Sequence, residues 1–324
     1  MNLARTSYFH ELTAGIGQSW NRFWFTPADA LPLCVLRIGV GLMALAFFLS
    51  FSDLTRWFTA DGLLPTSSVQ LLLTSPDNSN YHISVLNYFR SPAELWTIHA
   101  LAIAAAALLT AGFFTRASTV LTLAAVLSYI HRAPMITGHQ EPVLALLLFY
   151  LCFAPAGRYV SLDAFWRRMR RSTATEASIN CEPALSLTAA VPLRLIQVHL
   201  AAFYVMLALT KISGPAWWNG DAVWYLMAQT HSRPVDLSSL RSNIFVINAW
   251  THAIVIFELL FSVLIWNRLA RPLLLSAGIV MWLSLALVTG LTLFCLTMLV
   301  ANIAFVSPAV LRRMCGNCAC VEAR

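Results

Sequence analysis

The only lysine of this chain is the side chain best suited to acid–base chemistry. Lys211 ends an apolar run of membrane length that begins near Arg194, and the other permanently charged basic residues are arginines. A buried lysine loses its proton far more readily than an arginine, and a neutral amine can act as a general base. The alternative is an interfacial lysine whose ammonium group snorkels to the lipid headgroups. Aromatic residues follow Lys211 in the sequence and could shield its side chain from water. Both interpretations of Lys211, as a buried base and as an interfacial lysine, are therefore kept.

A histidine and two acids are expected at the level of Lys211. His139 and Glu141 precede an apolar segment, where they could relay a proton or bind a polar group of a substrate. The alternative is a solvated turn, because Pro142 suits the first turn of a helix. Candidate substrate-binding residues near the lysine are Glu141, Trp217, Trp218 and Asp221.

His252 and Glu258 lie within another apolar segment. They are six residues apart, so they do not share a helix face and cannot form a local metal pair. An ionisable residue deep in a span is a functional candidate by default. His252 is therefore assigned as a helper of Lys211. For Glu258 we favour a structural ion pair with Arg37 in the first span.

Composition indicates a helical membrane protein. Of 324 residues, 59% are hydrophobic and 11% are charged, whereas soluble proteins carry about 25% charged residues. No charge interrupts the stretch between Arg271 and Arg312. As a helix it would reach roughly 60 Å, twice the hydrocarbon thickness, so we split it near Gly290. The net charge of +7 could suggest nucleic acid, but an arginine excess in cytoplasmic loops accounts for it better.

The expected fold is an all-α, polytopic transmembrane bundle of about eight spans. Residues 1–28 form an amphipathic interfacial helix, residues 29–310 the transmembrane domain, and residues 311–324 a Cys-rich tail. The spans are expected near 31–51, 94–114, 118–130, 143–156, 193–212 and 247–266, with two more on either side of Gly290. The third and fourth are short for full crossings.

Arginine distribution predicts the orientation of the bundle in the cell membrane. Eight crossings put both termini on one side, and most arginines fall on that side, which is therefore cytoplasmic. Lys211 then lies at the outer end of the fifth span. In the tail, Cys315, Cys318 and Cys320 could bind a metal or react with oxidants, but without a nearby histidine we expect no metal site. No pattern indicates an oligomeric state or a protein partner.

The segment around Lys211 resembles a known signature. Tyr204, Lys211 seven residues later, and Trp217-Trp-Asn-Gly220 are similar to the signature segment of the vitamin K-dependent gamma-carboxylase and its bacterial relatives, the HTTM-domain proteins. The resemblance covers about residues 15–310, and this segment is its most specific part. Further agreement comes from Leu36-Arg37-Ile-Gly, Asp61-Gly-Leu-Leu-Pro65, Phe153-Ala-Pro-Ala-Gly157, Ser161-Leu-Asp163 and Gly290-Leu-Thr-Leu-Phe.

The resemblance implies quinol chemistry. In the carboxylase the matching lysine is regarded as the base that starts oxygenation of vitamin K hydroquinone, so Lys211 would be the base and a reduced naphthoquinone the cofactor. His139 falls near a family histidine. This chain departs at Thr210, where the carboxylase has another lysine, and at Trp282, where many relatives carry histidine.

The carboxylase also has a large extramembrane region after its spans, whereas this chain ends soon after the eighth. Quinol oxidation at Lys211 is therefore better supported than carboxylation of protein glutamate. We expect a quinol-dependent, oxygenase- or carboxylase-like enzyme embedded in the lipid bilayer, with His139, Glu141 and His252 as helpers. The alternative is a non-catalytic membrane transporter, or a partner subunit for another membrane enzyme.

Overall fold

Helices make up nearly all of the described structure. The computed structural model describes residues 2–59, 61–73, 83–89, 91–171, 185–229, 240 and 243–314, and within them the side chains of all but residues 2–12, 72–73 and 171. Across these ranges the extended backbone pairing is a single bridge between Ala28 and Ser186. The expected all-α fold is confirmed.

Ten helices have at least ten residues within the described ranges. They are α1 (Asn2–Phe25), α2 (Leu31–Leu49), α5 (Pro92–Ala111), α6 (Thr115–Arg132), α7 (Gln140–Phe153), α8 (Leu162–Arg171), α9 (Leu187–Ile212), α12 (Ile244–Leu264), α13 (Ala270–Thr289) and α14 (Thr292–Asn302). Shorter helices are α3 (Leu54–Phe58), α4 (Thr66–Leu73), α10 (Pro215–Trp218), α11 (Ala222–Ala228) and α15 (Pro308–Met314), with 3₁₀ turns η1 (Val85–Tyr88), η2 (Pro134–Ile136) and η4 (Ile303–Phe305).

Several of these helices can cross a membrane. By length and composition α2, α5, α9, α12 and α13 qualify, and the pair formed by Thr292–Phe305 and α15, bent by 115°, would make a sixth. Helices α6 and α7 occupy the positions expected for the third and fourth spans, but α7 has only 14 residues and α6 is less apolar. The chain is therefore a helical membrane bundle with five or six helices that meet both criteria.

The break inside the uncharged stretch lies where it was predicted. Helix α13 ends at Thr289 and α14 begins at Thr292, and Gly290 between them has a φ of 69°. This left-handed conformation is open to glycine without steric cost, so glycine commonly ends a helix here.

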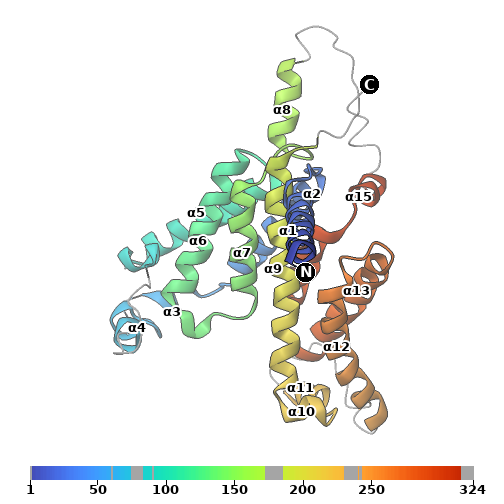
Figure 1. Ribbon diagram of the computed structural model, residues 1–324. Helices are drawn as coiled ribbons and strands as arrows, with labels where there is room; N and C mark the ends of the chain where they lie inside the picture. Colours follow the sequence, from blue (N-terminus) through green and yellow to red (C-terminus); the bar gives the residue numbers. More distant parts are fainter. Residues whose placement is uncertain are drawn as a thin grey trace.

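Helix α9 is the central element of the arrangement (Figure 1). Helices α5, α6 and α7 lie on one side of it, and α12 and α13 on the other. Helix α12 packs on α9, whereas α2 packs on α5, α7 and α14. Helices α10 and α11 lie at the end of α9 that carries Lys211, and α8 lies at the opposite end. Short helices therefore lie at both ends of α9.

The predicted N-terminal helix is α1, which packs along α9. The ring of Phe23 meets the ring of Trp266 edge-on, with centroids 5.6 Å apart. Other aromatic residues of α1 stay exposed, among them Trp20 and Phe25. An exposed aromatic face is what an interfacial helix would present to lipid.

Candidate functional site

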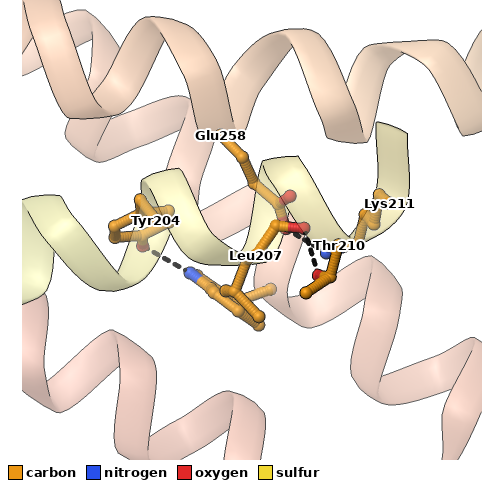
Figure 2. Close-up of polar contacts among 6 residues, drawn as sticks. Tyr204, Leu207, Thr210, Lys211 and Glu258 are labelled. Atoms are coloured by element: carbon orange, nitrogen blue, oxygen red, sulfur yellow. Dashed lines mark hydrogen bonds and ion pairs between the residues drawn. The ribbon is translucent and has the colours of Figure 1, made fainter. Parts of the chain in front are cut away.

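An ion pair joins the end of α9 to the middle of α12. Lys211 Nζ lies 2.6 Å from Glu258 Oε1. The Glu258 side chain has no exposed surface, and that of Lys211 retains 16%. Figure 2 shows the two side chains pointing toward one another from facing helices. The arrangement places one acid and one base in contact at the rim of an apolar bundle.

Aromatic packing sets the register of this pair. Tyr204 is two turns before Lys211, so both lie on one face of α9. The ring of Tyr204 lies against that of Phe261, with centroids 4.1 Å apart. Phe261 is one turn after Glu258. The contact partners therefore follow opposite chain directions on α9 and α12, so the two helices are antiparallel. This register brings Glu258 to Lys211.

The expected ion pair between Arg37 and Glu258 is wrong. Arg37 is fully buried and donates to the carbonyl oxygens of Leu109, at 3.0 Å, and Val160, at 2.6 Å. Leu109 belongs to the last turn of α5, where carbonyl groups lack helical partners and the helix dipole favours a cation. Helix α2 packs on α5, whereas α12 packs on α9, so the guanidinium group meets these carbonyls instead of the carboxylate.

A buried polar cluster lies next to the ion pair. Trp282 Nε1 donates to the hydroxyl oxygen of Tyr204 at 2.8 Å. The same hydroxyl group is hydrogen-bonded to the side-chain amide of Asn302, with its oxygen 2.9 Å from Nδ2 and 3.2 Å from Oδ1. Figure 2 places Tyr204 on the same helix as Lys211, and Lys211 is nearer the end of that helix. The cluster therefore links α9 to α13 and α14.

Of the aromatic and acidic candidates beyond Lys211, one contacts it. The ammonium nitrogen lies 5.3 Å from the ring centroid of Trp217, within cation–π range. Trp218 is exposed, and its indole N–H donates to the carbonyl of Ile212 at 2.5 Å. Asp221 precedes α11 without capping it through its side chain. Trp217 is therefore the aromatic residue that packs against the ammonium group of Lys211.

The three residues expected to assist Lys211, which are His139, Glu141 and His252, are not hydrogen-bonded to it. His139 is exposed at the start of α7, with its ring 5.8 Å from that of Phe294. Glu141 is buried, and its Oε2 has no hydrogen-bond partner. His252 is exposed, with Nδ1 2.8 Å from the carbonyl oxygen of Asn248 in its own helix. Within the described ranges, no hydrogen bond or ion pair joins any of the three to Lys211.

In the described part of the chain, no group of three or more His, Cys, Asp or Glu side chains is placed to hold a metal ion. The tail cysteines Cys315, Cys318 and Cys320 lie outside the described residues. The chemistry that the observed arrangement offers is proton transfer between Lys211 and Glu258.

Glu258 was not expected to be the partner of Lys211. A signal was available, because Glu258 is the only carboxylate in its span and Lys211 the only lysine of the chain. The polar cluster of Tyr204, Trp282 and Asn302 had no such signal, since hydrogen-bonding residues of this kind also occur elsewhere in the spans. His199 of α9 forms an interhelical hydrogen bond with Tyr150 of α7, at 2.8 Å.

Comparison with protein-family models, with curated proteins and with solved structures found no match.

Proposed function

We propose that the chain is a membrane protein of the HTTM family that binds a lipid-like quinol and oxidises it, with Lys211 as the base. The observation that carries this proposal is the contact of 2.6 Å between Lys211 Nζ and Glu258 Oε1 at the end of an apolar helix pair. A lysine beside a buried acid can pass its proton to that acid and so become a neutral amine, the form that accepts a proton.

The proton balance of the proposed step depends on Glu258. Transfer of the shared proton from Nζ to Oε1 leaves a neutral amine and a neutral acid, and low-polarity surroundings favour neutral groups over a charged pair. The amine then accepts a phenolic proton from the quinol. Dioxygen takes two electrons and the remaining hydroxyl proton from the quinolate, which leaves the quinone and hydroperoxide, and the hydroperoxide takes the proton held by Lys211 to give hydrogen peroxide. Carboxylation of a protein substrate is not part of the proposal.

The polar atoms around Lys211 suit a hydroxyl-bearing aromatic ligand. Glu258 Oε2 is buried and has no hydrogen-bond partner, so it can accept a hydrogen bond from a quinol hydroxyl group. The ring of Trp217 supplies an aromatic surface against which a second ring can stack. A reduced naphthoquinone carries both features.

The proposed orientation places this chemistry at the outer face of the cell membrane. It follows from the excess of arginines on the side of the two termini. Lys211 and Arg194 are about 25 Å apart along α9 at 1.5 Å per residue, close to the hydrocarbon thickness. Both termini are then cytoplasmic.

Quinol turnover by the purified chain tests the proposal. The full chain in lipid nanodiscs would be supplied with a reduced naphthoquinone in air, and oxidised product would be measured. Lys211→Ala should abolish turnover. Thr210→Ala should retain it, because among the described residues the Thr210 hydroxyl group bonds only to the carbonyl of Leu207 in its own helix. Turnover that is unchanged in folded Lys211→Ala would refute the proposal.

One observation favours a non-catalytic transporter or partner subunit instead. Two cavities, one between α2, α9, α13 and α15 and one between α1 and α9, are lined by described residues away from Lys211. This alternative predicts that the wild-type chain forms no epoxide or oxidised quinone. Mass spectrometry of co-purified lipid discriminates further, because a quinone retained by wild type and lost from Trp217→Ala would favour the quinol site.

A further inference from the structure

Three arginines line a cavity at the end of the bundle opposite Lys211. The cavity has a volume of about 480 Å³ and lies between α2, α9, α13 and α15. Its charged lining residues are Arg194, Arg271, Arg312 and Asp29, which give it a net charge of +2. In Figure 1 this is the end of α9 near α8 and α15. We call it the arginine cavity.

Most of this positive charge is not neutralised by the residues that the structure describes. Arg312 forms an ion pair with Asp29. Arg194 instead donates to Gln197 Oε1 at 3.0 Å, and Arg271 donates to the carbonyl oxygen of Ile265 at 3.1 Å. In the described part of the chain neither has a carboxylate within ion-pair distance. The charges of Arg194 and Arg271 also repel one another, so an anion between them would remove a cost of folding.

Two of the arginines have unused donors inside the protein. The Nε groups of Arg194 and Arg312 are buried and have no hydrogen-bond acceptor among the described residues. A buried N–H group without an acceptor is costly. Arg116, at the start of α6 and outside the cavity, is by contrast exposed to solvent. The arginine cavity therefore differs from a solvated basic surface, and its donors suit the oxygens of a phosphate group.

An apolar groove lies beside the arginine cavity. The groove lies between α1 and α9, has a volume of about 840 Å³, and is lined by Ile16, Trp20, Phe23, Trp24 and Val198 among others. Phe23 links the two spaces, because the guanidinium carbon of Arg194 lies 5.0 Å from the centroid of its ring. Val198 is one helical turn beyond Arg194 on α9. A charged space and an apolar groove thus meet at one residue pair.

We propose that the arginine cavity and the groove together bind one anionic phospholipid, with the phosphate among Arg194, Arg271 and Arg312 and an acyl chain along the groove. The net charge of the cavity favours an anionic headgroup over a zwitterionic one. The neighbouring groove, whose Phe23 contacts Arg194 of the cavity, favours a lipid over free phosphate, because phosphate has no acyl chain to fill the groove. This site is independent of the chemistry proposed at Lys211.

Lipid binding to the delipidated full chain tests the proposal. The chain would be titrated with phosphatidylglycerol, with phosphatidylcholine and with inorganic phosphate, and occupancy followed by native mass spectrometry and by the change in melting temperature. Phosphatidylglycerol should bind at least about tenfold more tightly than phosphatidylcholine. Equal binding of the two lipids, or stabilisation by inorganic phosphate equal to that by phosphatidylglycerol, would overturn the proposal.

Variants separate the two parts of the site. Arg194→Gln with Arg271→Gln should weaken phosphatidylglycerol binding about tenfold or more, whereas Arg116→Gln, the same change outside the cavity, should leave it unchanged. Val198→Trp, which fills the groove, should also weaken binding several-fold. Unchanged binding in either test variant contradicts the model of the site. If the double variant does not fold, the lipid preference of the wild type still decides.

Discussion

Glu258 meets Lys211 at 2.6 Å because α9 and α12 run antiparallel with Tyr204 against Phe261. The contact joins residues 47 positions apart in the sequence. Its acid is fully buried, whereas its base keeps a small exposed surface. A buried charge that loses its partner costs more free energy than the pair contributes, so the contact has a measurable signature in stability as well as in chemistry.

The first prediction concerns the stability of the pair. Lys211→Met leaves the Glu258 carboxylate buried without a partner and should lower the free energy of unfolding by about 3 kcal/mol, near the low end of the range for buried pairs because Lys211 keeps some exposure. Lys211→Met with Glu258→Met should recover most of this loss. Thermal unfolding in detergent provides the double-mutant cycle. Additive effects of the two substitutions would show that the residues do not interact.

The second prediction concerns the polar cluster next to the pair. Tyr204→Phe removes the hydroxyl group that accepts from Trp282 and bonds to Asn302, and leaves these buried groups unsatisfied. The loss should be about 2 kcal/mol. The same change at Tyr225, which is exposed on α11, should alter the melting temperature little. Equal effects at the two positions would contradict a structural role for the cluster.

The third prediction is a pH dependence at Asp163, outside the spans. Partial burial raises the pKa of this carboxyl group, but hydrogen bonds from Thr115 and Phe114 and the charge of Arg167 outweigh burial, so the pKa lies below its ordinary value. The carboxylate caps the start of α6. A lowered pKa stabilises the fold above the ordinary aspartate pKa of about 3.9, and this contribution is lost as pH falls through the lower folded pKa.

Asp163→Ala should therefore cost about 1–2 kcal/mol at neutral pH. The gap between wild type and variant should stay constant above pH about 5 and shrink below pH about 4. Unfolding of both proteins across this range measures it. A gap that already disappears near pH 6 would be inconsistent with a carboxylate whose pKa is lowered.

The fourth prediction uses the close approach of Gly112 to Arg37. Gly112 has a φ of 73°, and a Cβ atom placed there would lie 1.8 Å from Arg37 Nη1. Gly112→Ala should strain the backbone and displace Arg37 from the carbonyl of Leu109, at a cost of about 3 kcal/mol. Gly15→Ala, where nothing lies within 4 Å, should be neutral or slightly stabilising. A melting temperature of Gly112→Ala close to that of wild type would argue against this packing.

The sequence was sufficient for features that depend on composition and on local pattern. Low charge and long apolar runs predicted a helical membrane bundle, and Gly290 predicted the break between α13 and α14. These properties depend on residues close together in the chain, so they can be recognised without knowledge of packing.

Partners across helices could not be predicted in the same way. Arg37 was assigned a carboxylate, but it bonds to backbone carbonyls of Leu109 and Val160, and carbonyls are present at every residue. Which one is reached depends on the packing of α2 on α5. Glu258 was recognised as an ionisable residue in a span, yet its partner depended on the register between α9 and α12, which the aromatic contact of Tyr204 with Phe261 sets.

The most direct test of Lys211 as a base is Lys211→Arg. Arginine keeps the positive charge and can still pair with Glu258, but it does not give up its proton to become a neutral base. We predict that purified Lys211→Arg keeps a melting temperature within a few degrees of wild type and loses at least about 99% of quinol oxidation, the hundredfold or larger contribution of a general base. Oxidation at the wild-type rate by folded Lys211→Arg would contradict the account.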